Sequence, residues 1–208
     1  MLEVERKLRR TGVVHIAGVD EAGRGPLAGP VVAAAVIFPP SFFLPAVDDS
    51  KRLSARMRER LFPQILGGAL AVGIGEADHE EIDQFNILNA TFLAMHRAVR
   101  SLGVTPGHLL VDGNRFRPGT GETPIPFTTL VGGDARSFSV AAASIVAKVT
   151  RDRRMCELDV QYPEYGFAQH KGYATSEHRQ ALRRWGPSAV HRRTFLHDEP
   201  HPLPLWDG

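Results

Sequence analysis

The chain has little cysteine and no long apolar run, and each scarcity excludes a class of structure. Cys156 is the single cysteine among 208 residues, so the chain can form neither an internal disulfide nor a cysteine-cluster metal site. No apolar stretch reaches membrane-spanning length, and residues 1–12 do not form a signal-peptide pattern. We therefore expect a cytoplasmic protein without a membrane partner. We expect Cys156 itself to be a small core residue on a helix.

The sequence also lacks internal repeats and long low-complexity segments. A chain of this length can bury one sizeable core. We expect residues 1–196 to form a single domain, in which about 160–196 make a small C-terminal helical piece. The proline-rich residues 197–208 are expected to form a poorly ordered tail.

The net charge is only +2, but it is unevenly distributed. Residues 136–193 contain eleven Lys or Arg and five Asp or Glu, a balance of +6 that leaves −4 for the rest of the chain. An acidic region beside a basic one suits an enzyme that binds a polyanion and cuts it with bound cations. An ordinary solvated surface can show the same asymmetry, so charge alone does not decide between the two.

Asp20 and Glu21 are adjacent carboxylates at the end of the apolar run Val13–Val19, which predicts a buried strand. A turn with one arginine between two glycines, Gly23–Gly25, leads to a second apolar strand over Val31–Phe38. Carboxylates at a strand end suit a hard divalent cation, and closely spaced glycines let backbone N–H groups approach a phosphate or a hydroxyl. The competing interpretation is a solvated acidic pair before an ordinary turn, but charge on a buried strand is costly unless compensated.

Apolar patterning predicts the remaining elements. The further strands are Ala69–Ile74, His108–Val111 and Phe127–Val131. The expected helices are Ser54–Ile65, which has Pro63 near its end, then Asn86–Leu102, Ser139–Glu157 and Thr175–Trp185. On the second helix, an apolar stripe is assigned to the core: Phe85, Leu88, Phe92, Met95, Val99 and Leu102. Three closely linked strands, followed by strands that alternate with helices, predict a mixed α/β sheet flanked by helices on both faces.

Two further acids follow predicted strands. Asp112 ends the fourth strand and Asp134 follows the fifth. Sites in open α/β sheets form at the carboxyl ends of neighbouring strands, so Asp20, Glu21 and Asp112 converge if the first and fourth strands are neighbours. Such crowded carboxylates repel one another without counter-cations, and two Mg²⁺ or Mn²⁺ ions would balance them and support phosphodiester cleavage. A strand-end Asp is more often a turn former or a helix cap, so the residues alone leave both interpretations open.

Five segments, in order along the chain, resemble the type 2 ribonucleases H, and specifically bacterial ribonuclease HII. They are Gly18–Pro30, Asp49–Ser54, Leu110–Asn114, Gly133–Asp134 with Ala142–Asp152, and Tyr165–Thr175. Five ordered motifs are far more specific than any one of them. The resemblance implies the ribonuclease H-like fold, which is a five-stranded mixed sheet flanked by helices with a small C-terminal helical piece that binds substrate.

The same resemblance implies a metal-dependent endonuclease. Its members hydrolyse the RNA strand of RNA–DNA hybrids and cut 5′ of single ribonucleotides in duplex DNA, leaving 5′-phosphate and 3′-hydroxyl ends. Asp20, Glu21, Asp112 and Asp134 match the family's catalytic acids, which bind Mg²⁺ or Mn²⁺. The partners implied are an RNA–DNA hybrid and ribonucleotide-containing duplex DNA, and we expect the protein to act as a monomer.

The substrate-binding residues that the resemblance implies lie in the glycine turn and the late tyrosine motif. Gly23, Arg24 and Gly25 match the family segment that reads the ribose 2′-hydroxyl, the group that distinguishes RNA from DNA. Tyr173 matches the tyrosine that packs on the sugar at the junction. One departure is Ala141, which stands where the family commonly has serine and therefore offers no hydroxyl contact.

Basic side chains near these motifs are candidate phosphate contacts, namely Lys51, Arg136, Lys148, Arg151 and Lys171. Lys148 is also spaced to pair with Asp152, four residues later on a helix. For His170 we favour a place in a satisfied hydrogen-bond network over a phosphate contact.

Three alternatives remain beside the leading interpretation. The sister enzyme ribonuclease HIII carries an extra N-terminal domain, for which twelve residues before the first strand leave no room, and a different residue in place of Arg24. A catalytically idle module that binds RNA–DNA hybrids would not need the intact acid set. A metal-dependent phosphatase for small substrates would leave the basic C-terminal third unexplained.

Overall fold

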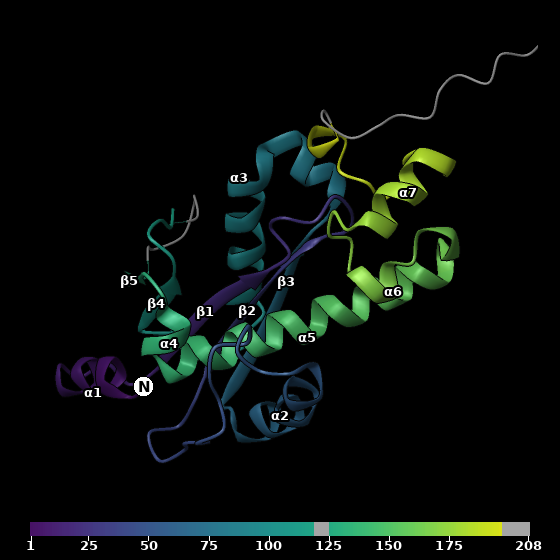
Figure 1. Ribbon diagram of the computed structural model, residues 1–208. Helices are drawn as coiled ribbons and strands as arrows, with labels where there is room; N and C mark the ends of the chain where they lie inside the picture. Colours follow the sequence, from purple (N-terminus) through teal and green to yellow (C-terminus); the bar gives the residue numbers. More distant parts are fainter. Residues whose placement is uncertain (119–124, 197–208) are drawn as a thin grey trace, which may run out of the picture.

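The computed structural model describes residues 1–118 and 125–196 (Figure 1). The strands are β1 Ile16–Ala22, β2 Val31–Ile37, β3 Ala71–Ala77, β4 His108–Asp112 and β5 Phe127–Leu130. The α-helices are α1 Glu3–Arg10, α2 Ala55–Gly68, α3 His79–Arg100, α4 Gly133–Arg136, α5 Phe138–Gln161, α6 Phe167–His170 and α7 Ser176–Trp185. Two short 3₁₀ helices follow α5 and α7, at Pro163–Tyr165 and Arg193–Phe195. The expected tail, 197–208, lies outside the described residues.

The five strands form one mixed sheet in the order β3-β2-β1-β4-β5. The antiparallel pairs are β1 with β2 and β2 with β3, whereas β4 runs parallel to both β1 and β5. This arrangement confirms the predicted sheet. It also makes the first and fourth strands neighbours, which is the condition on which convergence of the acids depended.

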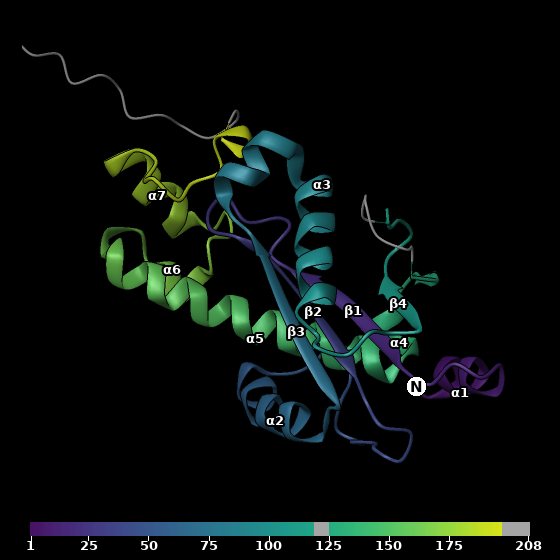
Figure 2. The same ribbon diagram turned by 180° about the vertical axis from the view of Figure 1, so that it is seen from behind.

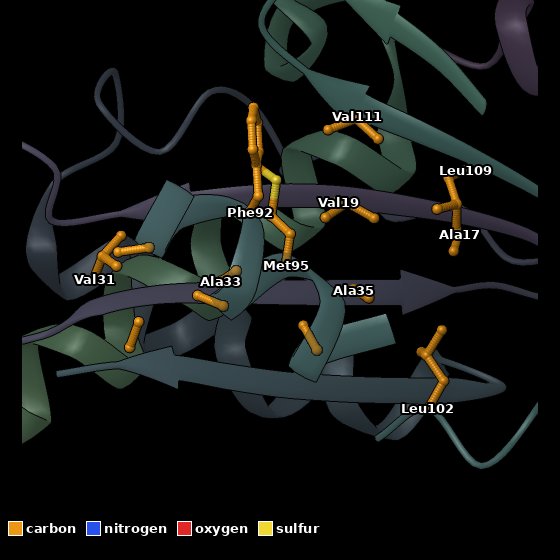
Figure 3. Close-up of a cluster of buried hydrophobic side chains, with 14 of the residues drawn as sticks. Ala17, Val19, Val31, Ala33, Ala35, Phe92, Met95, Leu102, Leu109 and Val111 are labelled. Atoms are coloured by element: carbon orange, nitrogen blue, oxygen red, sulfur yellow. The ribbon is translucent and has the colours of Figure 1, made fainter. Parts of the chain in front are cut away.

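Helices cover both faces of the sheet, with α5 in front of the strands in Figure 1 and behind them in Figure 2. Side chains alternate between the faces, as strand geometry requires. Val19 and Ala33 face α3, where they pack under Phe92 and Met95 (Figure 3). Ala34 belongs to the other cluster, which is shared with α5 and α2. The charged ends of the strands are therefore mounted on a sheet buried from both sides.

Gly18 allows the closest approach between α5 and β1. A Cβ atom at Gly18 would lie 2.1 Å from the backbone carbon of Ser139, near the start of α5. Only glycine permits this contact, because the obstacle is backbone that cannot rotate away. The contact places the beginning of α5 two residues along β1 from Asp20, and so ties the helix to the acidic end of the strand.

Several predicted boundaries differ from the structure. The helix expected at Asn86 begins at His79, because Asp78 and Glu81 form a capping box there. Asn86 has φ 66° and kinks α3, which leaves Phe85 exposed and outside the predicted core stripe. Pro63 lies inside α2 and does not end it.

Helix α1 was not predicted, because its apolar stripe consists only of Val4 and Leu8 in an otherwise charged sequence. Its buried Glu5 accepts hydrogen bonds from the hydroxyls of Ser137 and Ser139 and from the Ser139 backbone N–H. A carboxylate at a helix N-terminus is favoured by the exposed N–H groups and the helix dipole. Helix α1 therefore anchors the start of α5.

The expected C-terminal helical piece follows α5, beyond the end of the sheet (Figures 1 and 2). It packs through Phe167 and Leu182 on Leu27, Ala28 and Met155. Since Leu27 and Ala28 lie between the glycine turn and β2, this piece touches the segment that links β1 to β2. No helix among the described residues is long and apolar enough to cross a membrane.

The close contact at Gly18 gives a stability prediction. Gly18→Ala forces α5 away from β1, and we expect it to lower the free energy of unfolding by about 1–3 kcal/mol or more. Gly67→Ala is the control, since a Cβ there meets nothing within 4 Å and alanine in a helix is favoured over glycine by about 0.5–1 kcal/mol. Urea denaturation measures both. Equal stability of the Gly18→Ala and wild-type proteins would contradict the packing.

Candidate active site

Parallel pairing of β1 with β4 brings Asp20 beside Asp112. The register aligns Val19 with Val111, so the next residue on each strand is an aspartate. Asp134 comes from α4, which is held close because the Gly133 N–H donates to Asp112 Oδ1 over 2.7 Å. One carboxylate oxygen from each of Asp20, Asp112 and Asp134 lies within 4.8 Å of the others. Such a set of oxygens can hold a divalent cation.

Glu21 lines the same hollow but points toward the glycine turn. Its Oε1 accepts a hydrogen bond from Arg24 over 3.3 Å. The hollow has a volume of about 300 Å³ and is lined by Asp20, Glu21, Ala22, Gly23, Arg24, Gly25, Ser50, Lys51, Arg58, Asp112, Lys148 and Tyr173. The structure thus brings together the predicted acids, the glycine turn, the tyrosine and two of the predicted lysines.

Without a bound cation, burial and mutual repulsion disfavour the charged forms of the acids. Burial, followed by repulsion from Glu21 and Asp112, raises the pKa of Asp20 well above its ordinary value. Burial also raises the pKa of Glu21 although Arg24 opposes it, and burial with repulsion from Asp112 raises the pKa of Asp134. For Lys51, partial burial acts to lower the pKa, but attraction to Asp134 and Asp20 outweighs it, so the pKa is raised.

Tyr173 stands at the open rim of the hollow. Its side chain is 43% exposed, and the Lys148 Nζ lies 6.0 Å from the ring centroid. A Cβ atom at Gly25 would lie 3.9 Å from Tyr173 Cε1. The aromatic ring and the glycine turn therefore face each other across a short gap beside the acids.

The remaining basic candidates have different surroundings. Lys51 contacts Asp134 over 3.6 Å, and Lys148 pairs with Asp152 over 2.7 Å, as its spacing predicted. Lys171 lies outside the acidic hollow and lines a neighbouring one of about 470 Å³ between α2 and α5. Arg136 lines a third hollow beside α1.

Two expectations about α5 were wrong. Arg151 is fully buried and donates to the carbonyls of Pro30, Ala28 and Lys171, which leaves it no contact with phosphate. Helical spacing explains this, because Arg151 shares a buried face with residues 147 and 155. Cys156 lies one position beyond that face and is exposed rather than buried in the core.

The expectation for His170 agrees with the structure. Its Nε2 lies 2.8 Å from the Tyr165 carbonyl oxygen, to which it donates, and its Nδ1 accepts from the Gly172 N–H over 3.2 Å. Both ring nitrogens are therefore satisfied within the chain.

Sequence reasoning missed Arg58, which lines the acidic hollow and donates to the Ser50 and Leu53 carbonyls. It also missed Arg192, which reaches the glycine turn from the far end of the chain. Nothing in the local sequence of either arginine signals these contacts. Their roles depend on how distant segments pack together.

Comparison with known proteins identifies the family of the chain. The sequence profile described as Ribonuclease HII matches residues 17–197. Ribonuclease HII of Syntrophotalea carbinolica is 55% identical over 194 residues, which cover 93% of this chain and 91% of the relative. This chain belongs to the ribonuclease HII family. Ribonuclease HII of Geobacillus kaustophilus is also 55% identical, over 94% of this chain and 73% of the relative.

Solved structures agree with the fold. The ribonuclease H2 of Pyrococcus horikoshii superposes with a TM-score of 0.71 at 29% identity, covering 86% of this chain and 93% of that chain. A ribonuclease HIII crystallised with Mn²⁺ has a TM-score of 0.67, covering 83% of this chain and 61% of that chain, but its 20% identity supports the fold alone. The family assignment confirms the resemblance and makes the protein a ribonuclease H endonuclease rather than an idle binding module.

The crowded acids predict an unusual effect of neutralising one of them. Asp112→Asn keeps the oxygen that accepts from Gly133 and removes one repulsive charge. We expect the metal-free variant to be more stable than wild type at pH 7 by about 1 kcal/mol, the order of one pKa unit of interaction.

The pH dependence follows from the raised pKa values. Folded wild-type protein binds protons at Asp20 and Asp134 that the unfolded chain does not, so the contribution of these two acids to stability rises as pH falls from 7 toward the ordinary aspartate value of 3.8. Asp112→Asn gains less stability than wild type as the pH falls, because one repulsive charge is already gone. The difference in unfolding free energy between the variant and wild type should therefore be smaller at pH 5 than at pH 7. Urea denaturation in chelator at both pH values measures this. If Asp112→Asn were less stable than wild type at pH 7, repulsion between the acids would not destabilise the metal-free protein.

Proposed function

We propose that the protein hydrolyses the RNA strand of RNA–DNA hybrids and cuts 5′ of single ribonucleotides embedded in duplex DNA, leaving 5′-phosphate and 3′-hydroxyl ends. The observation that carries this proposal is the meeting of carboxylate oxygens from Asp20, Asp112 and Asp134 within 4.8 Å of one another. Asp20 and Asp112 line a hollow that is also lined by the glycine turn and Tyr173. Family membership supports the same reaction.

The donor set fits divalent metal ions. Mg²⁺ and Mn²⁺ prefer carboxylate oxygens, and Asp20, Asp112 and Asp134 supply three of them while Glu21 lines the same hollow. The raised pKa of Asp20, caused by burial and by repulsion from Glu21 and Asp112, supports a site that lacks counter-charge without a cation. When bound, two such ions supply an activated water and stabilise the leaving oxygen of the phosphodiester.

The chain's own side chains position the nucleic acid around this centre. The Gly23–Gly25 turn offers backbone N–H groups without side-chain cover, and we propose that it reads the ribose 2′-hydroxyl. The ring of Tyr173, across the gap from Gly25, would pack on the adjoining sugar. Lys51 and Lys148 line the hollow and would contact the flanking phosphates. Lys171, in the adjacent hollow, and Arg136 are contacts for phosphates farther along the duplex.

The metal requirement predicts the first functional test. We expect a duplex carrying one ribonucleotide to be cut in Mg²⁺ or Mn²⁺ and to stay intact in excess EDTA. Asp20→Asn should lower the rate by about a thousandfold or more, because metal-assisted catalysis contributes several kcal/mol. Glu157→Gln, which neutralises an exposed carboxylate on α5, is the matched control and should cut normally. Wild-type rates in EDTA or in Asp20→Asn would refute the proposed centre.

Tyr173 predicts a second test. Tyr173→Ala removes the ring that positions the sugar, and small misplacements can cost about a hundredfold in rate. We expect single-turnover cleavage of the one-ribonucleotide duplex to fall by that order while binding weakens less, with a smaller effect on a long uniform hybrid. Tyr173→Phe retains the ring and serves as the control. Equal single-turnover rates for Tyr173→Ala and wild type would remove Tyr173 from the site.

A further inference from the structure

Residues 190–192 lie beside residues 27–29, the segment between the glycine turn and β2. Gly29 N donates to the Val190 carbonyl over 2.9 Å, and Arg192 N donates to the Leu27 carbonyl over 2.8 Å, so the two segments run antiparallel with Ala28 opposite His191. Successive side chains of an extended segment point to opposite sides. His191 and Arg192 therefore reach different parts of the molecule from adjacent positions.

Arg192 reaches the glycine turn. It is fully buried, and its Nη2 and Nη1 donate to the carbonyls of Gly23 over 2.7 Å and Arg24 over 3.0 Å, while Nε donates to the Gly29 carbonyl. The planar guanidinium can hold two successive carbonyls at once, which the single ammonium of lysine cannot do with the same geometry.

This contact determines how the turn presents its N–H groups. In a planar trans peptide, the carbonyl of one residue and the N–H of the next point in opposite directions. Since the carbonyls of Gly23 and Arg24 point toward Arg192, the N–H groups of Arg24 and Gly25 point away from it. Residues 23–25 line the acidic hollow, so Arg192 directs the donors that would read a 2′-hydroxyl.

His191 reaches the tyrosine loop, residues 171–175 between α6 and α7, through a second histidine. The Ser188 N–H donates to His191 Nδ1 over 2.9 Å, so the proton of the neutral ring is on Nε2, which lies 3.0 Å from His178 Nε2. His178 Nε2 must accept, and its protonated Nδ1 donates to the Tyr173 carbonyl over 2.9 Å. One arrangement of protons satisfies the whole chain, and it ends on the residue whose ring faces the glycine turn.

Arg151 also contacts both groups, because its side chain packs against Gly23 and its guanidinium carbon lies 5.9 Å from the centroid of the Tyr173 ring. The guanidinium of Arg151 joins the Lys171 carbonyl to those of Ala28 and Pro30, and the Leu27 N–H donates to the Gly172 carbonyl. The hydrogen bonds of Arg151 therefore join the segment after the glycine turn to Lys171, whereas its packing reaches Gly23 and Tyr173 without a hydrogen bond to the Gly23, Arg24 or Tyr173 carbonyl. Among the described residues, the Gly23 and Arg24 carbonyls have Arg192 as their side-chain partner, and the Tyr173 carbonyl has His178.

We propose that the dipeptide His191-Arg192 is the positioning element for ribonucleotide recognition, because Arg192 orients the peptides of the glycine turn while His191, through His178, fixes the backbone of Tyr173. The side-chain hydrogen bonds to the carbonyls of both groups thus trace back to one short segment far downstream of the acids. This inference rests on the proposed function, which assigns the glycine turn and the Tyr173 ring to opposite sides of the same sugar.

The test uses His191→Phe, which retains an aromatic ring without nitrogens, and Arg192→Lys, which retains charge without the two-pronged contact. Leu182→Ala is the matched control, because Leu182 is buried in the same C-terminal cluster but makes no side-chain hydrogen bond to either loop. For each protein we measure the melting temperature, the amplitude and the rate constant of single-turnover cleavage at saturating enzyme. The substrate is the one-ribonucleotide duplex.

We expect both positioning variants to lower the rate constant about tenfold or more, whereas Leu182→Ala lowers the melting temperature and at most the amplitude. His191→Phe should lower the rate constant when it is introduced into the wild type. It should have no further effect when it is introduced into Tyr173→Ala, since its effect passes through the Tyr173 ring. A purely structural role would lower amplitude alone, or would act equally in both backgrounds, and either result overturns the proposal. If Tyr173→Ala lowers the rate constant of cleavage but His191→Phe does not, this inference alone is refuted. If Tyr173→Ala leaves the rate constant unchanged, the proposed function of the tyrosine is refuted as well.

A measurement on the wild type keeps the proposal testable if a variant does not fold. Amide exchange followed by NMR, with the duplex bound in EDTA to prevent cleavage, should slow at Arg24 and Gly25, whose N–H groups point away from Arg192. Unchanged exchange at both amides in the bound protein would overturn the orientation that we assign to Arg192.

Discussion

The parallel pairing of β1 with β4 is the constraint on which the rest of the site depends. It aligns Val19 with Val111, so the strands end on Asp20 and Asp112 at the same edge of the sheet. The Gly133 N–H bond to Asp112 then brings α4 and its Asp134 to that edge. The pairing itself is stabilised by apolar side chains buried on both faces of the sheet. The core therefore holds together carboxylates that repel one another.

This conflict links stability to function. Burial, together with repulsion from neighbouring carboxylates, raises the pKa values of Asp20 and Asp134, so these acids oppose folding at neutral pH. A divalent cation would remove that cost. Around the acids, buried arginine and histidine side chains donate hydrogen bonds to backbone carbonyls. Arg151, Arg192 and His178 each do this at the loops that border the hollow. Acids form the floor of the site, and the backbone of two loops forms its rim.

The sequence predicted the acids of the site, but it predicted little of what holds the glycine turn and the loop of Tyr173 in place. Asp20 and Asp112 could be placed because apolar strands end visibly, and their pairing followed from the topology. Boundaries set by local capping were missed, as at His79, where the Asp78 cap outweighs the apolar pattern. Arg151 was misassigned because a basic residue was expected at the surface, and Arg192 was overlooked because its partners lie 168 and 169 residues away. Contacts of that kind depend on tertiary packing rather than on any local pattern.

The central claim is that three carboxylates from β1, β4 and α4 form one divalent metal site. Anomalous X-ray diffraction from crystals soaked in Mn²⁺ tests it most directly, because manganese is located without reference to the protein atoms. The account predicts a peak within coordination distance of carboxylate oxygens from Asp20, Asp112 and Asp134. Manganese bound only elsewhere, or none at saturating concentration, would contradict it.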